Sequence, residues 1–377
     1  MTRLTKSTAR YSVGMIGVGR KGTAHANGYT HHPMTEVVDA ADPDEANLEL
    51  FCRRFNIKAA YTDYKEMLRK EKLDIVAPIL PVSVNPEVVI DCARAPGVRA
   101  IFCEKPMAAR LSDADAMVDE CRSRGIYFAA GDAYRSFRQL WAARKMMEAG
   151  DLGEVKSIHL FQSTDEISGG GCQGLSVIRM FAWDAEVDWL TGWVSDDPFS
   201  EHDQAMGGMV RFKNGIDAYV DFQPVGKKGI EINCTKGYLF ADWWSFRLWK
   251  TKDGKIPRRF DEMHEVTGLF GPGLEDDRGR DAQGRLLPGN RQMDSIQSIV
   301  DSLELGIEPR CSGENMRKVL EITLALRESA RRNHAPVRVP LEDRSLTIFP
   351  DRSRWLNKKG VLGAEEYAKQ IGNFDRK

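Results

Sequence analysis

The sequence predicts a mixed α/β protein of two domains. Residues 1–130 should form a doubly wound parallel sheet, and residues 131–341 an α+β domain with a mostly antiparallel open sheet. The prediction rests on a regular alternation of strands and helices up to about residue 130, followed by strands joined through short turns. With 377 residues the chain also exceeds one ordinary hydrophobic core. Residues 342–377 read as a tail with only a short helical pattern near 364–370.

The first half alternates apolar runs of strand length with amphipathic stretches. Strands are expected at 11–16, 37–41, 59–61, 73–80, 98–103 and 126–130, and helices at 23–29, 45–55, 62–70, 85–94 and 111–124. Parallel strands need such crossovers, because two of them cannot be joined by a tight hairpin.

The second half is dominated by strands. After a helix at 137–149, strands are expected at 155–163, 208–212, 216–222, 230–235 and 239–241, with one long helix at 173–190 between the first two. Asn214-Gly215 predicts a two-residue hairpin. Residues 268–291 read as a surface loop, and 293–305 and 315–332 as the closing helices.

Composition excludes several classes of function. A net charge of −1 gives no electrostatic footprint for nucleic acid or a membrane surface. No apolar run is long enough to cross a bilayer, and the segment before Tyr11 lacks an apolar core for export. Seven scattered cysteines without a C-x-x-C pair indicate reduced thiols in a cytoplasmic protein. The histidines show no metal-ligand spacing, so no metal site is expected.

A glycine-rich turn follows the first expected strand and opens the first expected helix. Gly17 allows the turn, Gly19 lets the backbone approach a pyrophosphate, and Gly22 lets the helix pack on the strand. The unpaired N–H groups of the helix N-terminus favour phosphate binding. This strand–turn–helix arrangement predicts a dinucleotide site that also includes Val18, Arg20 and Lys21.

Asp42 ends the second strand, about 20 residues beyond the last glycine, where a carboxylate binds the adenosine ribose. A carboxylate repels a 2′-phosphate, so NAD is expected rather than NADP, although Arg20 and Lys21 could reach a phosphate from the turn. The alternative is that Asp42 only caps the next helix.

Several segments together resemble one family, the Gfo/Idh/MocA oxidoreductases. They are G-V-G-R-K-G (17–22), Y-T-D-Y (61–64), C-E-K-P (103–106), G-D-L-G-E-V (150–155), S-G-E-N-M-R-K-V-L (312–320) and A-P-V-R-V-P (335–340). The resemblance implies a Rossmann domain, NAD or NADP, and hydride transfer at a hydroxyl-bearing carbon of a sugar or polyol. It also implies a homodimer or homotetramer formed through the sheet of the second domain.

Lys105 is the main catalytic candidate. A lysine at the carboxyl end of a parallel strand faces the ligand crevice, where it can stabilise alkoxide character; the alternative is a solvated surface lysine. By resemblance Glu104, Lys105, Pro81 and Asn85 lie at the cofactor. Asn85 stands in a loop where relatives often carry a histidine, and it could equally cap a helix.

The family's second-domain histidine, its usual acid/base group, is missing. Counting from the glycines at 169–171 puts Arg179 at the position of this histidine and Leu175 at the position of the family's aspartate four residues earlier. Counting back from Trp189-Leu190 puts Ala182 at the position of the histidine instead.

The remaining candidates for catalytic and substrate-binding residues belong to the second domain. Tyr134 and Asp184 could move a proton, and a substrate could be bound by Arg179, Trp183, Arg135 and Asp165, although such residues also populate the wet face of a helix. The main hypothesis is an NAD-dependent dehydrogenase of a sugar, polyol or glycoside. The alternatives are a redox-neutral enzyme that oxidises a sugar transiently before an elimination, and a non-catalytic NAD-binding protein.

Overall fold

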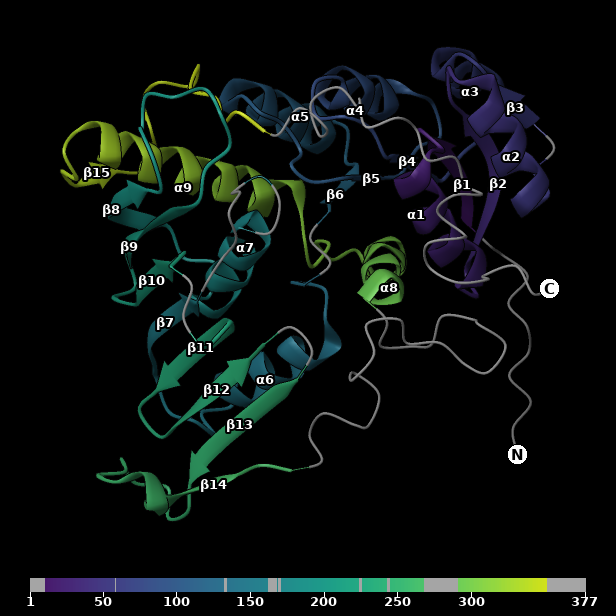
Figure 1. The fold of residues 1–377 in the computed structure, drawn as a ribbon. Coiled ribbons are helices and arrows are strands. Elements are labelled where there is room, and N and C mark those ends of the chain that lie inside the picture. The colour runs from purple at the N-terminus through teal and green to yellow at the C-terminus, as the bar shows by residue number, and fades with distance from the viewer. Residues whose placement is uncertain are drawn as a thin grey trace, which may run out of the picture.

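The computed structural model describes residues 11–57, 59–131, 134–161, 168, 171–223, 226–242, 245–267 and 291–350. Two sheets lie beside one another, each covered by helices (Figure 1). In this described part, no helix combines the length and the apolar character needed to cross a membrane.

The first sheet is parallel throughout, as expected. Its order is β3-β2-β1-β4-β5-β6, formed by β1 (Tyr11–Ile16), β2 (Thr35–Ala41), β3 (Ala59–Tyr61), β4 (Ile75–Pro78), β5 (Ala100–Cys103) and β6 (Tyr127–Ala130). The helices between the strands are α1 (Arg20–His31), α2 (Glu45–Phe55), α3 (Tyr64–Lys70), α4 (Asn85–Arg94) and α5 (Leu111–Ser123). The strand order reverses between β1 and β4, and ligands bind at the carboxyl ends of the strands at such a point.

A helix from late in the chain completes this first domain. Ile296, Ile299 and Leu303 of α8 (Arg291–Leu305) share a core with residues of β1, β2 and β4. A Cβ added to Gly28 of α1 would lie 2.7 Å from Ile296 Cδ1, so the two helices pack closely. The division at residue 130 therefore separates the two sheets but leaves α8 with the first one.

The second sheet is mixed and mostly antiparallel, with the order β14-β13-β12-β11-β7-β10-β9-β8-β15 and one parallel pair, β7 with β10. Its strands are β7 (Val155–Phe161), β8 (Val187–Val194), β9 (Met206–Phe212), β10 (Asp217–Asp221), β11 (Gly229–Cys234), β12 (Gly237–Ala241), β13 (Phe246–Thr251), β14 (Met263–Glu265) and β15 (Val337–Arg338). Asn214-Gly215 turns between β9 and β10 with Gly215 at φ 86°, so the hairpin is confirmed. The helices α6 (Arg138–Glu148), α7 (Cys172–Phe181) and α9 (Gly313–Arg331) belong to this part of the chain.

The long helix expected at 173–190 is wrong. α7 ends at Phe181, and the chain turns through Trp183 and Asp184, whose φ angles of 62° and 56° are left-handed and cannot continue a helix. Residues 187–194 then form β8, whose Gly192 lies against α9: a Cβ there would be 2.5 Å from Leu326 O. The sequence also failed to predict β13, β14 and β15.

The start of the expected tail packs on the fold. The backbone N–H groups of Leu111 and Ser112, at the start of α5, donate to the carbonyls of Leu346 and Arg344. The Arg344 guanidinium contacts Asp115 of α5 and Glu321 of α9. The expected loop at 268–290 and the helical pattern near 364–370 lie outside the described residues.

Candidate active site

The glycine-rich turn between β1 and α1 has the close packing its sequence predicts. Gly17 has φ 80°, and a Cβ on it would lie 2.6 Å from Ile79 O, while one on Gly22 would lie 2.0 Å from Gly17 O. The α1 N-cap, Gly19, has no side chain, and the first turn of the helix carries no acidic residue. The positive end of this helix thus fits the phosphates of a dinucleotide.

Asp42 ties this turn to the end of β2. One carboxylate oxygen accepts from the Val18 N–H at 2.7 Å and the other from the Asp44 N–H at 2.9 Å. Burial raises the pKa of Asp42, against the two backbone donors, which lower it. Asp44, not Asp42, caps α2 through Ala46 and Asn47. Asp42 is therefore positioned beside the cofactor turn rather than on the helix.

Lys105 follows β5 directly, at the same edge of the sheet. Its backbone N–H donates to Glu104 Oε2 at 2.9 Å, and Glu104 Oε1 lies 2.7 Å from His25 Nε2 of α1. Gly131 closes over this corner, because a Cβ on it would lie 2.7 Å from the Lys105 nitrogen. Although burial favours the neutral acid, His25, Lys21 and Lys105 hold the pKa of Glu104 well below its usual value.

Sequence reasoning missed His25. The available signal was its position three residues after Gly22, one turn into the helix that begins at the phosphate-facing end. The positive charge of Lys21 is one of the causes that lower the pKa of Glu104. Arg20 is exposed.

Asn85 is buried at the start of α4, next to the Lys105-Pro106 segment. Its Nδ2 lies 3.5 Å from Pro106 O, and its Oδ1 has no hydrogen-bond partner among the described residues. The N-cap position of α4 belongs to Val84, so the side chain of Asn85 is not a helix cap. A buried acceptor without a donor fits a site completed by a polar ligand. Pro81 lies in the same loop after β4, where its carbonyl accepts from the Val84 N–H.

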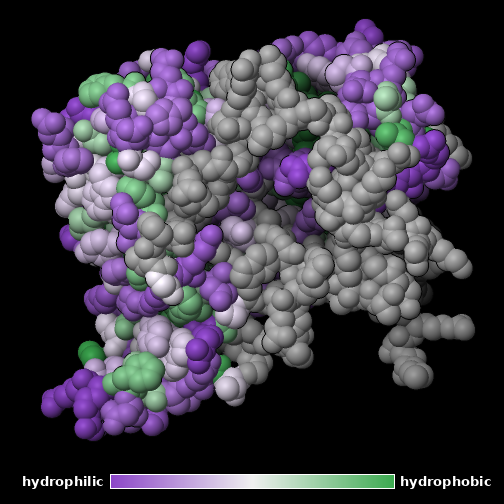
Figure 2. Space-filling view, viewed as in Figure 1, coloured by the Kyte–Doolittle hydropathy of each residue, from purple (hydrophilic) through white to green (hydrophobic). Residues whose placement is uncertain are grey.

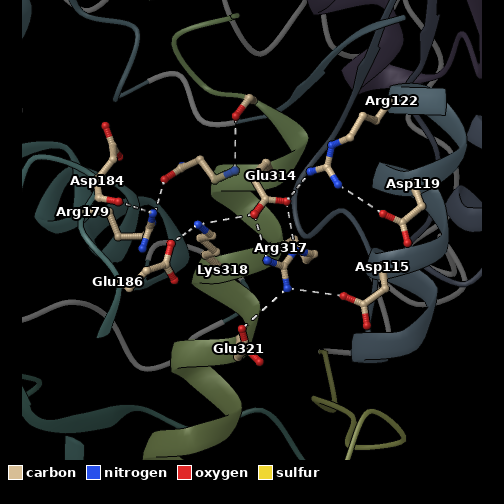
Figure 3. A network of polar contacts seen from close by, with 12 residues as sticks. Asp115, Asp119, Arg122, Arg179, Asp184, Glu186, Glu314, Arg317, Lys318 and Glu321 are labelled. Carbon is tan, nitrogen blue, oxygen red and sulfur yellow. Dashed lines mark hydrogen bonds and ion pairs between the residues drawn. The ribbon is translucent and has the colours of Figure 1, made fainter. Parts of the chain in front are cut away.

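Arg179 does not face a cleft. It is 3 % exposed, and its three nitrogens donate to Asn315 Oδ1 and to the carbonyls of Ala185 and Asp184. Figure 3 shows it against Asp184 at the side of the ion-pair network on α9. These contacts leave no face of the guanidinium for a substrate, contrary to the expectation that Arg179 binds an anionic group.

Arg135, Asp184 and Trp183 belong to the same structural cluster. Arg135 donates to Asp184 Oδ1 at 2.7 Å and to Ser176 O at 3.0 Å, while Arg144 donates to Asp184 Oδ2 at 3.1 Å. Trp183 packs beneath the Arg144 guanidinium, 5.2 Å from its ring centroid. Despite burial, Arg135, Arg179 and Arg144 lower the pKa of Asp184, so its carboxylate stays ionised and is a poor proton acceptor.

Two of the expected site residues remain to be placed. Tyr134 is half-buried beside Phe137, with the ring centroids 5.8 Å apart. Asp165 lies outside the described residues. Trp189 and Leu190 lie in β8 and not on the helix that the count back from them assumed.

The residues that the fold brings together come from the carboxyl ends of β1, β2, β4 and β5. They are the glycine-rich turn, Asp42, Asn85 and the Glu104-Lys105 pair, all in the first domain. A parallel sheet of this order, with a glycine-rich turn and a lysine after β5, defines a dinucleotide-binding oxidoreductase.

Comparison with known proteins gives the same class. Residues 11–131 match the model of the oxidoreductase family Gfo/Idh/MocA, described as an NAD-binding Rossmann fold. Over 348 residues the chain is 28% identical to myo-inositol 2-dehydrogenase of Thermotoga maritima, covering 84% of this chain and 95% of that protein. It is 25% identical to an NADP-linked D-xylose 1-dehydrogenase of Haloferax volcanii, covering 84% and 96% of the two chains.

A structure of levoglucosan dehydrogenase with NADH and levoglucosan has the same fold, with a TM-score of 0.70 at 20% identity over 88% of this chain and all of that one. Residues 11–131 therefore match the NAD-binding Rossmann fold of the Gfo/Idh/MocA oxidoreductases, which the sequence motifs also indicated, and NAD is the cofactor class of this domain.

Proposed function

We propose that this protein transfers a hydride between NAD and a hydroxyl-bearing carbon of a sugar, polyol or glycoside, with Lys105 as its principal catalytic residue. Relatives along nearly their whole length are named as dehydrogenases of inositol and xylose. The observation that carries the proposal is Lys105 at the carboxyl end of β5, beside the glycine-rich turn and the unpartnered acceptor of Asn85.

The chain would hold the cofactor through the α1 N-terminus, Asp42 and the Asn85 loop. The bound nicotinamide supplies the hydride acceptor or donor. The Lys105 ammonium hydrogen-bonds the reacting hydroxyl and stabilises negative charge on its oxygen as the C–H bond breaks. Gly131 packs closely against the backbone nitrogen of this lysine.

The hydroxyl proton needs an acceptor, and the second domain supplies no histidine in the family's slot. The Asp184 carboxylate accepts from Arg135, and Arg179 donates to the Asp184 backbone carbonyl. We propose that the hydroxyl proton leaves to solvent water, directly or through Tyr134, while the Lys105 ammonium donates a hydrogen bond to the oxygen that loses it. Neither a transient-oxidation mechanism nor a purely binding role is favoured by any contact in the site.

Replacing Lys105 tests the proposal. Lys105→Ala should lower turnover by roughly 10²-fold or more, because general acid–base and electrostatic assistance are both lost. The control is Lys70→Ala, which removes an exposed i,i+4 ion pair with Glu66 on α3 and should leave turnover unchanged. Near-normal turnover of the Lys105 variant would show that the lysine is structural.

We also propose that the chain pairs with a second copy through the face of the second sheet that none of the described helices covers. Neighbouring strands align one row of side chains on this face, none of them fully buried: Met209, Tyr219, His159, Glu231, Phe240 and Arg247. The opposite face is buried under helices. A half-exposed aromatic row of this kind is typical of an interface. A cytoplasmic location is proposed as well, supported by scattered cysteines without paired spacing.

A further inference from the structure

His25 touches Glu104, and Glu104 touches the backbone of Lys105. Glu104 uses its two carboxylate oxygens in opposite directions, one toward His25 Nε2 at 2.7 Å and one toward the Lys105 N–H at 2.9 Å. The His25 and Glu104 side chains are 14% and 16% exposed, so water competes little for either contact. The His25 ring is held from another side by Phe102 of β5, with the ring centroids 5.1 Å apart.

Both contacts persist at neutral pH. The surrounding positive charges hold the pKa of Glu104 well below its usual value, so it remains a carboxylate that accepts both hydrogen bonds. Charge-assisted hydrogen bonds of this kind are about twice as strong as neutral ones. Because Glu104 stays ionised, the pair is suited to fixing geometry rather than to storing the hydroxyl proton.

The two ends of this chain of contacts lie on the two parts of the site. His25 sits on α1, whose N-terminus begins at Arg20 beside the glycine-rich turn, and Lys105 follows β5. We propose that His25 is a positioning residue: through Glu104 it fixes the Lys105 main chain to the helix that binds the cofactor phosphates. The inference rests on the role proposed for Lys105, and it adds a residue that does not itself touch the reacting atoms.

Two variants separate the hydrogen bond from the bulk of the ring. His25→Leu keeps an apolar side chain against Phe102 but removes the nitrogen that meets Glu104. His25→Gln places an amide nitrogen near the position of Nε2. The control is His31→Leu, at the other end of the same helix, where the imidazole Nδ1 lies 2.6 Å from the Asn27 carbonyl of its own helix.

The first measurement is steady-state kinetics, with the dissociation constant for NADH obtained separately by fluorescence titration. His25→Leu should lower kcat by about tenfold to 10²-fold, because small misplacements of a catalytic group cost that much. KM and the NADH dissociation constant should change by less than about threefold. His25→Gln should recover kcat to within about threefold of wild type, and His31→Leu should match wild type. An unchanged kcat in His25→Leu, or a glutamine variant as impaired as the leucine variant, would overturn the inference.

The second measurement needs no substrate. An amine-specific reagent labels Lys105 with and without saturating NADH, and mass spectrometry gives the rate. Bound NADH should slow labelling at least about fivefold in wild type and in His25→Gln, but less than about twofold in folded His25→Leu. Full protection in the leucine variant, or none in wild type, would overturn the inference. If wild type protects Lys105 but oxidises no sugar or polyol, the proposed function fails and the positioning role stands. If the leucine variant does not fold, His25→Asn takes its place, because its shorter amide cannot reach Glu104. NADH should then protect Lys105 from labelling in His25→Gln but not in His25→Asn, and equal protection in both would overturn the inference.

Discussion

Asp42 accepts a hydrogen bond from the turn that would hold the cofactor, and we expect its carboxylate to lie at the position where NAD and NADP differ. Its two carboxylate oxygens accept from the backbone of Val18 and Asp44, so its position is set before any ligand arrives. The positive charge of Lys21, one of the two candidates for a phosphate partner, lowers the pKa of Glu104. The residues expected at the cofactor could be predicted because a single sequence motif specifies both the glycine-rich turn and the position of the aspartate that follows it.

We expect NAD(H) to bind at least about tenfold more tightly than NADP(H), a difference of ~1.4 kcal/mol, because Asp42 repels a 2′-phosphate. Fluorescence titration with NADH and NADPH measures it. Asp42→Ser should reduce the difference in affinity between NADH and NADPH. Glu36→Gln, a change at an exposed position of β2, should not. Equal or tighter NADPH binding by wild type would contradict the assignment.

Asp184 shows where residue-level prediction failed. Its sequence position suggested a proton acceptor, but its partners are three arginines, two of which lie more than 30 residues away along the chain. A single sequence does not show such long-range pairing. The structure therefore changes the expected phenotype from lost chemistry to lost stability.

Asp184→Asn should destabilise the fold by about 1.5–3 kcal/mol at pH 7, the usual cost of losing a hydrogen bond to a charged group, and leave kcat within about threefold. Since the folded-state pKa of Asp184 is lowered, its contribution is present above the unfolded pKa and is lost as pH falls below about 4. Urea unfolding of wild type and variant at pH 7 and pH 3.5 tests both points. A large loss of turnover with unchanged stability would instead show that Asp184 takes part in catalysis.

At the scale of elements, the first domain was predictable and the end of α7 was not. Buried parallel strands are apolar throughout and alternate with amphipathic helices, so each boundary has a local signal. Residues 173–190 are apolar in a pattern that suits a helix, and only the left-handed turn at Trp183 and Asp184 separates α7 from β8. That turn is held by Arg144 and Arg135, which are tertiary partners without a local signature.

Strand β2 contains a titratable group whose ionisation opposes folding. Asp39 is 5% exposed, and burial together with Glu71 raises its pKa to about 6. A raised carboxyl pKa means that stability is greatest below the unfolded pKa near 4 and is lost as pH rises through 6.

Asp39→Asn should therefore stabilise the protein above pH 7 by up to about 3 kcal/mol, from two pKa units at 1.36 kcal/mol each. The gain should vanish near pH 4, where wild-type Asp39 is protonated in the folded state. Urea unfolding across pH 4–8 measures the difference, with Glu36→Gln as the exposed control on the same strand. A variant that is less stable than wild type at pH 8 would show that the carboxylate makes a favourable contact there.

At the scale of the whole molecule, segments from the end of the chain join the two sheets. α8 packs on the first sheet, and Arg344 links α5 to α9. Figure 3 shows the adjoining network, in which Arg317 of α9 contacts Asp115 of α5 and Glu314 of its own helix. The sequence predicted two domains but not these links, because contacts between helices that are far apart in the chain leave no periodic pattern.

The open face of the second sheet also belongs to this scale. Tyr219 contacts His159 with the ring centroids 4.7 Å apart, and Lys227 lies over the rings of Phe161 and Phe240 at 4.4 and 4.8 Å. Further along, Tyr238 stacks on Trp249 at 4.6 Å. In the view of Figure 2, hydrophobic residues lie among polar ones over β13 and β14. Aromatic residues mixed with charges favour a specific interface over a patch that aggregates.

If two copies meet on this face, light scattering after size exclusion should give at least twice the 42.4 kDa mass of one chain. Tyr219→Glu combined with Phe240→Glu places two carboxylates in the middle of the aligned row, where an interface would leave them buried without partners. This double variant should elute as a folded single chain. Phe199→Glu, on a loop where the ring is 65% exposed, adds a carboxylate outside the sheet and should keep the wild-type mass. A wild-type protein of single-chain mass, or a double variant that keeps the oligomeric mass, would place the contact elsewhere or exclude it.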